Sequence, residues 1–159
     1  MRSPRVALLV AALPFAAACS SKSPLTNQGQ TTTYSASLKG SNEVPSNAET
    51  SSGTATFSLT GSTMGYTVYV TTLTAAANLS HIHLGAAGVV GPVILPFTIN
   101  TGVTTGTLVT GTIDLTQSIN GGTISGDSLR ALFNNGNIYV NVHTPTHPGG
   151  EVRGQVVKQ

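Results

Sequence analysis

The four histidines of this 159-residue chain fall in two short segments. His81 and His83 are separated only by Ile82, and His143 and His147 follow much later, in a segment rich in proline and glycine. Residues two apart in a β-strand project from the same face, so His81 and His83 would present two imidazoles side by side. Such a pair supplies half of a typical metal site.

A third imidazole stands at the end of a second alternating segment. Val140 and Val142 alternate there with Tyr139, Asn141 and His143, which places His143 on the polar face. If the two segments are neighbouring strands, three imidazoles converge. Three neutral imidazoles suit Cu(II) or Zn(II), and we name copper as the candidate cofactor. The lack of nearby cysteines or clustered carboxylates disfavours iron–sulfur and calcium sites.

His147 is a candidate fourth ligand, although its place in a proline-flanked loop also fits a solvated side chain. The competing interpretation of His81, His83 and His143 is a structural hydrogen-bonding network without a metal. Tyr139 is expected to reach this cluster, and the other tyrosines are expected to pack in the core or in strand pairs.

Charged residues near the C-terminal end offer a second candidate feature. Arg153 and Glu151 are two apart on one strand face, which predicts an exposed ion pair, while the alternative is that Arg153 guides an anion as a catalytic residue. Glu43 precedes Pro45, where a bend is expected, and is interpreted as a structural hydrogen-bond acceptor rather than a rim acid.

The N-terminal segment is typical of a secreted protein. Residues 1–18 combine Arg2 and Arg5 with an apolar run, which predicts a signal peptide. The small residues before Cys19 resemble a bacterial lipobox, although Ala16 stands where leucine is usual. We therefore expect lipidation of Cys19 and anchoring to the membrane, which would be the outer membrane in an organism that has one. Ordinary cleavage leaving a free thiol is the alternative.

Residues 19–33 are polar and predict a flexible tether between this lipidated cysteine and a domain spanning residues 34–159. Cys19 is the only cysteine, so no internal disulfide can form. Charged residues make up 8% of the chain, and removing Arg2 and Arg5 leaves five basic side chains against five acidic ones. This balance disfavours a nucleic-acid partner and indicates no oligomeric state.

Short alternating segments predict an all-β fold, an antiparallel β-sandwich with one short helix. Ala55, Phe57 and Leu59 alternate with hydroxyl side chains, and residues 61–65 predict a hairpin turn into a segment of the same kind. Further strands are expected at residues 80–84, 93–99, 107–115, 138–143 and 151–157. Asp127 is expected to cap a helix that stops at Gly136.

Several of these segments together resemble the CHRD domain, named for chordin. The resemblance is carried by Leu38–Pro45, Gly53–Ala55, Ser80–Gly85, Gly91–Val93, Tyr139–Thr144 and Pro148–Gln155. It covers about residues 34–157 in order, with Ser46 where a second proline is common and with His147 as an unusual addition. The resemblance implies a β-sandwich found in secreted bacterial proteins and in extracellular chordins that bind growth factors, and it implies no settled activity.

The chain also shows a weaker similarity to the copper–zinc superoxide dismutases. This similarity is the basis of an alternative function, copper-dependent redox catalysis. His81, His83, His143 and Arg153 stand in the order of that family's copper ligands and anion-guiding arginine. No histidine lies between His83 and His143, so the metal-bridging and zinc ligands of that family are missing.

We therefore expect a membrane-tethered binding module of the cell envelope, with an envelope protein, a glycan or a metal ion as partner, rather than an enzyme. The alternative is a copper-dependent redox enzyme resembling superoxide dismutase. No Ser-His-Asp arrangement, phosphate-binding loop or dinucleotide fingerprint supports another enzyme class.

Overall fold

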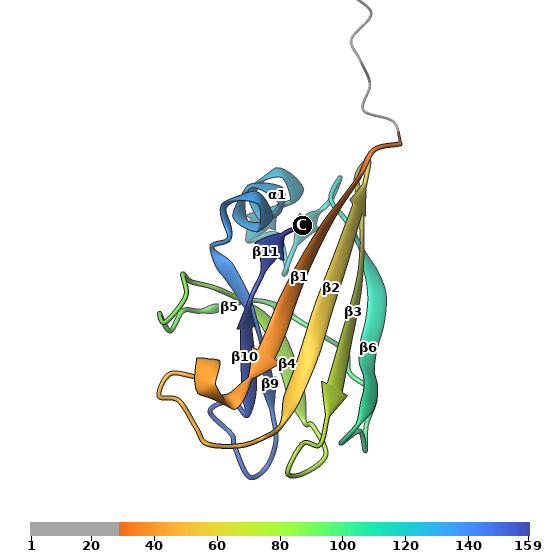
Figure 1. The fold of residues 1–159 in the computed structure, drawn as a ribbon. Coiled ribbons are helices and arrows are strands. Elements are labelled where there is room, and N and C mark those ends of the chain that lie inside the picture. The colour runs from red at the N-terminus through yellow and green to blue at the C-terminus, as the bar shows by residue number, and fades with distance from the viewer. Residues whose placement is uncertain (1–28) are drawn as a thin grey trace, which may run out of the picture.

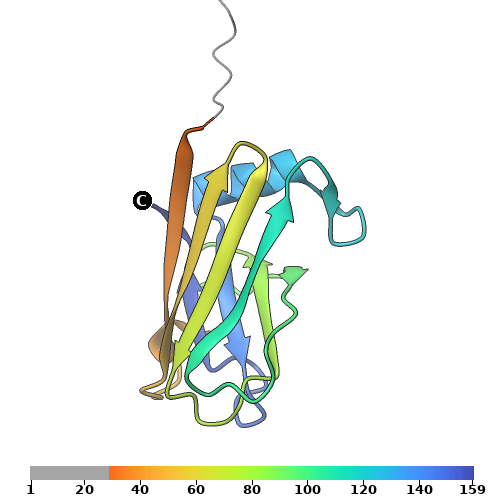
Figure 2. The ribbon, with the colours of Figure 1, turned by 90° about the vertical axis from the view of Figure 1, so that its right-hand side faces the viewer.

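Two layers of antiparallel strands face each other across the core, and one helix covers an end of the stack (Figures 1 and 2). The computed structural model describes residues 29–159, so the expected signal peptide and Cys19 lie outside the described residues. One layer contains β1 (Thr31–Lys39), β2 (Ser52–Thr60), β3 (Thr63–Thr71) and β6 (Gly106–Asp114). The other contains β5 (Val93–Pro96), β4 (Leu79–Leu84), β9 (Ile138–His143) and β10 (Val152–Gln155).

Both layers belong to one curled sheet because β1 pairs with β2 on one side and with β10 and β11 (Val157–Lys158) on the other. The smaller elements are η1 (Gly40–Asn42), the β7 (Ser118–Ile119) and β8 (Ile124–Ser125) ladder, and α1 (Gly126–Asn135). The all-β sandwich with one short helix is thus confirmed.

The core fills the space between the layers with the apolar half of each alternating strand. Leu38, Ala55, Val68, Ile82 and Val140 are completely buried. Phe133 of α1 closes one end of this core, with its ring 4.8 Å from that of Phe57 and 5.1 Å from that of Tyr34. Burying this apolar surface supplies the main driving force for folding, since no disulfide is available.

Most expected strands are confirmed, with shifted ends. The segment 138–143 is β9 as predicted, whereas the expected strand 151–157 is divided because Gln155 ends the pairing with β9 and Val157 pairs with β1 instead. β1 begins at Thr31, so three residues assigned to the tether belong to the sheet. β3 starts at Thr63, which makes the hairpin turn shorter than predicted. The ladder of β7 and β8 was not predicted.

The cap of α1 corrects the sequence-based assignment. The side chain of Ser125, not Asp127, occupies the N-cap position and accepts a hydrogen bond from the Ser128 amide at 3.1 Å. Asp127 lies in the first turn, where its negative charge interacts favourably with the helix dipole. Gly136 ends the helix as expected, with a φ of 63° that suits glycine.

We predict that Ser125→Ala lowers the free energy of unfolding by about 1 kcal/mol, because an amide of the first turn loses its acceptor. Asp127→Asn should cost only about 0.3–0.5 kcal/mol, since it weakens an exposed interaction with the helix dipole. Urea unfolding of both variants checks the assignment. A larger loss for Asp127→Asn than for Ser125→Ala would contradict it.

Within residues 29–159, no helix has the length and apolarity needed to cross a membrane.

Candidate metal centre

Pairing between β4 and β9 brings the histidines of the two sequence segments together. His81 lies opposite Asn141, His83 lies opposite Tyr139, and His143 lies two pairs beyond His81, opposite Leu79. Alternate residues of the two strands point into the core, so the imidazoles occupy the outer face of this layer. The predicted convergence of three imidazoles from neighbouring strands is therefore present.

The three rings approach one another closely enough to share one ion. One ring nitrogen from each of His81, His83 and His143 lies within 4.8 Å of the other two. His81 Nδ1 is 3.3 Å from His143 Nε2, and the His81 ring centroid is 5.5 Å from that of His83. Tetrahedral sites with metal–nitrogen bonds of about 2.0–2.1 Å separate their nitrogens by about 3.3 Å. The closest pair already has this spacing.

Backbone carbonyls fix the tautomer of two of these rings. His83 Nδ1 is 3.0 Å from the carbonyl oxygen of Gly91, and His143 Nδ1 is 3.0 Å from that of Pro148. A carbonyl can only accept, so both Nδ1 atoms carry the proton and both Nε2 atoms carry a lone pair. His143 Nε2 accepts from His81 Nδ1, whereas the buried His83 Nε2 has no hydrogen-bond partner in residues 29–159.

Three loops cover the outer face of β9 and enclose the cluster. Residues 85–92 supply the carbonyl of Gly91, residues 144–151 supply that of Pro148, and the loop after η1 places Glu43 beside Asn141. Every residue of β9 is buried as a result, including the polar ones. Alternation correctly predicted which side chains face outward, but these side chains lie beneath loops rather than in solvent.

The enclosure keeps the imidazoles neutral. Burial, together with the neighbouring His143 and His83 rings, lowers the pKa of His81 to about 4. Burial also lowers the pKa of His83 and of His143, against the raising effect of their carbonyl partners. All three rings are therefore uncharged near neutral pH, the form in which imidazole binds a metal.

Tyr139 and Arg153 form a stack on the His83 ring. The Tyr139 ring lies parallel to that of His83, with an angle of 11° and a centroid separation of 4.7 Å. The Arg153 guanidinium covers the Tyr139 ring at 3.4 Å from its centroid. Arg153 also donates to the carbonyls of Val89 and Ala86, at 2.7 and 3.3 Å. The stack thus fixes the His83 ring and holds the 85–92 loop over it.

We expect Tyr139→Leu to lower the free energy of unfolding by about 2–3 kcal/mol, because it removes both stacking contacts from a buried position. Tyr139→Phe keeps the stack and loses only the hydroxyl contacts with Gly91, so it should cost about 1 kcal/mol. Urea unfolding of both variants measures the difference. Equal losses for Phe and Leu would show that the hydroxyl, not the stack, provides the stability.

The expected ion pair between Glu151 and Arg153 is wrong, since both side chains are buried and each has other partners. Glu151, fully buried, accepts hydrogen bonds from Ser51 Oγ, Thr74 N, Thr74 Oγ1 and Thr144 Oγ1 at 2.5–2.7 Å. Burial alone would raise the pKa of Glu151, but these donors outweigh it and hold the pKa below its usual value. Glu151 therefore joins three separate loops as a buried carboxylate.

Glu43 is a structural hydrogen-bond acceptor, as predicted. Its Oε2 accepts from Asn141 Nδ2 at 3.4 Å, while Oε1 is buried without a partner in the described chain. Burial raises the pKa of Glu43 to about 7, against the lowering effects of Arg153 and Asn141. Glu43, Arg153 and Gln155 line a cavity of about 320 Å³.

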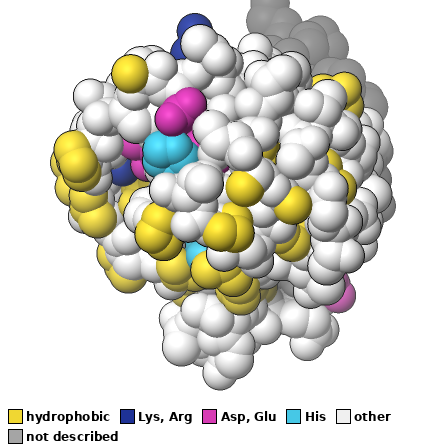
Figure 3. Space-filling view, turned by 90° about the horizontal axis from the view of Figure 1, so that it is seen from below, with side chains coloured by type: hydrophobic (Ala, Val, Ile, Leu, Met, Phe, Trp, Pro, Cys, Tyr) yellow, Lys and Arg dark blue, Asp and Glu magenta, His cyan; other side chains and the backbone are white. Residues whose placement is uncertain are grey.

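His147 does not join the cluster. Its Nε2 is 3.1 Å from Glu49 Oε1, and the two side chains are 25% and 37% exposed. The carbonyl of the next residue, Pro148, contacts His143, but the His147 ring itself pairs with Glu49. Figure 3, which views this end of the molecule, shows imidazole and carboxylate side chains adjacent at the surface. The structure thus places His147 apart from the three grouped imidazoles, and a role as fourth ligand stays a prediction.

Comparison with known proteins identifies the domain. A family model for the CHRD domain matches residues 34–156. No curated protein and no solved structure matches the chain. The match spans both layers of the sandwich and all three clustered histidines. The chain therefore belongs to the CHRD-domain family.

Proposed function

We propose that this CHRD domain binds one copper or zinc ion through His81 Nδ1, His83 Nε2 and His143 Nε2. The observation that carries the proposal is the buried lone pair of His83 Nε2, which has no partner in residues 29–159, on a ring that offers a nitrogen within 4.8 Å of one from each of the other two rings. Buried polar atoms are rarely left unpaired, because their desolvation costs about 1–3 kcal/mol. A metal ion would satisfy this lone pair.

The surroundings of the rings favour a metal over a purely structural network. The carbonyls of Gly91 and Pro148 accept hydrogen bonds from Nδ1 of His83 and His143. Metal-binding histidines usually donate such a bond from the ring nitrogen that does not bind the metal. A bound ion would take the place of the hydrogen bond between His81 Nδ1 and His143 Nε2. The proton of His81 would then be carried by its Nε2 instead of its Nδ1. Three imidazoles without thiolate or carboxylate favour Cu(II) and Zn(II).

We further propose that the domain acts in the cell envelope, anchored to a membrane through lipidated Cys19, where an envelope protein or glycan is its partner. The N-terminal sequence alone supports this placement. Expression of the chain with and without Cys19→Ser tests it. The unmodified chain should associate with the membrane, and the Cys19→Ser variant should not. Secretion of both proteins in soluble form would contradict the proposed lipid anchor.

We favour binding over copper-dependent redox catalysis. The alternative gives Arg153 the task of guiding an anion, but its guanidinium is packed on Tyr139 and bound to two carbonyls. Arg153 is only 3% exposed, which limits its reach toward solvent. These contacts support a structural role, in which Arg153 holds the loop that orients His83.

Calorimetric titration of the metal-free chain with Cu(II), and separately with Zn(II), tests the metal site. We expect saturable binding of one ion per chain, accompanied by loss of affinity at acid pH because protons compete for the three imidazoles. Binding no stronger than that of an isolated surface histidine would contradict the proposal and leave a structural network.

A further inference from the structure

The outer face of the layer formed by β1, β2, β3 and β6 is an array of hydroxyl groups. Alternation directs the aliphatic side chains of these strands to the core and leaves mainly serine and threonine outside. Tyr69, which is 44% exposed, lies among them in the row of Thr54 and Thr107, and the charged Lys39 and Asp114 stand at strand ends. The outward serine and threonine residues are Thr31, Thr33, Ser35, Ser37, Ser52, Thr54, Thr56, Ser58, Thr60, Thr63, Thr67, Thr71, Thr107, Thr110 and Thr112. We refer to this set as the hydroxyl face. It lies on the layer opposite the histidine cluster.

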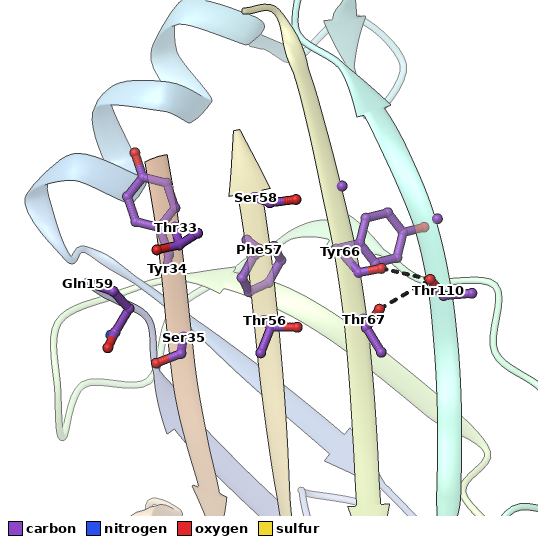
Figure 4. A pocket seen from close by; sticks show the side chains of 12 residues that line it. Thr33, Tyr34, Ser35, Thr56, Phe57, Ser58, Tyr66, Thr67, Thr110 and Gln159 are labelled. Carbon is purple, nitrogen blue, oxygen red and sulfur yellow. Dashed lines mark hydrogen bonds between the residues drawn. The ribbon is translucent and has the colours of Figure 1, made fainter. Parts of the chain in front are cut away.

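The register of the strands aligns these hydroxyls into rows across the sheet. In the central row, Ser35 pairs with Thr56, Thr56 with Thr67, and Thr67 with Thr110. Neighbouring strands lie about 4.8 Å apart, and successive rows about 6.8 Å apart, so the array is regular in two directions. Figure 4 shows side chains of this row on the four neighbouring strands. Thr67 Oγ1 and Thr110 Oγ1 are 3.2 Å apart.

A hollow of about 430 Å³ lies on this layer. Its outward lining consists of hydroxyl residues together with Gly65 and the C-terminal Gln159. Gly65 occupies the row between Ser58 and Thr112, where a side chain would fill the hollow. The volume lies in the range of pockets that hold small ligands, about 300–1,000 Å³.

The chemistry of the hollow selects among partners. No charged side chain lines it, which disfavours nucleic acids, anionic lipids and polyuronates as ligands. Serine is depleted in protein–protein interfaces, whereas aromatic residues, methionine and arginine are enriched there. The outer face of this layer carries many hydroxyls, no methionine or arginine, and a single exposed aromatic side chain, Tyr69. Hydroxyl groups both donate and accept hydrogen bonds, so their natural complement is a neutral surface of other hydroxyls.

We propose that the hydroxyl face binds a neutral polysaccharide chain. The sugar hydroxyls form hydrogen bonds with the rows of serine and threonine. Part of the sugar chain occupies the hollow at Gly65, and the rest lies along the remainder of the face. This site is on the other layer of the sandwich from the metal centre and is independent of metal binding. The inference rests on the proposed location in the cell envelope and specifies the glycan partner as a neutral polysaccharide.

The test is a titration of the chain with cellohexaose, a neutral hexasaccharide, followed by two-dimensional NMR. We expect saturable binding that is insensitive to salt, with shifts concentrated at the residues lining the hollow. The double variant Thr56→Val and Thr67→Val removes two central hydroxyls while keeping side-chain shape and strand propensity. It should weaken binding roughly tenfold, which is the loss expected for about two neutral hydrogen bonds.

The matched control is the double variant Thr54→Val and Thr107→Val, which removes two outward hydroxyls of the next row that do not line the hollow. It should bind within about twofold of the unmodified chain. No saturable binding of cellohexaose would overturn the proposal. Equal losses in the two double variants, shifts confined to the histidine cluster, or stronger binding of an oligogalacturonate would overturn it as well.

Discussion

Joint replacement of His81, His83 and His143 by alanine is expected to abolish tight copper binding. Each imidazole contributes one of the three nitrogen donors, and a site left without them has no thiolate or carboxylate in the group to compensate. We expect the affinity for Cu(II) to fall by at least about 100-fold, since changes merely to groups that support metal ligands cost about 10–100-fold. Calorimetric titration of both proteins measures the change.

His147→Ala provides a matched control. It also removes an imidazole, but from a side chain that pairs with Glu49 outside the cluster. Its affinity for copper should equal that of the unmodified chain. Copper affinity that survives the triple replacement would refute the ligand set. If the triple variant fails to fold, the loss of copper affinity can be measured in the single variant His83→Ala. This variant keeps the hydrogen bond between His81 and His143.

The second large effect concerns Glu151. Replacing it with alanine is expected to lower the free energy of unfolding by about 3–5 kcal/mol, because a buried charged acceptor is removed from four donors. Those donors come from Ser51, Thr74 and Thr144, so three loops lose their common partner. Urea unfolding at neutral pH measures the loss. Glu49→Ala, which removes a partly exposed glutamate, should cost less than about 1 kcal/mol.

Glu151 also gives the fold a defined response to acid. Its pKa is lower in the folded chain than the usual glutamate value of 4.5, so its contribution to stability is present above that pH. The contribution is lost as the pH falls from about 4.5 through the folded-state pKa. Glu151→Gln cannot ionise and should therefore show a smaller decline of stability in this acid range. An identical pH profile for Glu151→Gln would contradict this role.

Much of the site follows from the period-2 geometry of strands. Ile82 between His81 and His83 placed both imidazoles on one face, and the alternation of Val140 and Val142 with polar residues placed His143 on the outer face of its strand. These inferences need only the direction of successive side chains, which strand geometry fixes locally. The sandwich fold was predictable for the same reason.

The surroundings of the histidines were not predictable in this way. The carbonyl of Gly91 and the Glu43 carboxylate reach the site only through the paths of long loops, and Glu43 lies 98 residues from its partner Asn141. The Glu151 network likewise joins residues 100 positions apart. Glu151 and Arg153 belong to the block by which the sequence resembles the CHRD family. Their buried side chains hydrogen-bond to residues of several loops, so this block of the sequence holds those loops in place.

Electron paramagnetic resonance of the chain loaded with one equivalent of Cu(II) tests the central claim most directly. Coordination by His81, His83 and His143 predicts splitting from three imidazole nitrogens, and this splitting should be absent in the triple alanine variant. A spectrum of hydrated copper, or nitrogen splitting that persists unchanged in the triple variant, would contradict a metal centre at these three histidines.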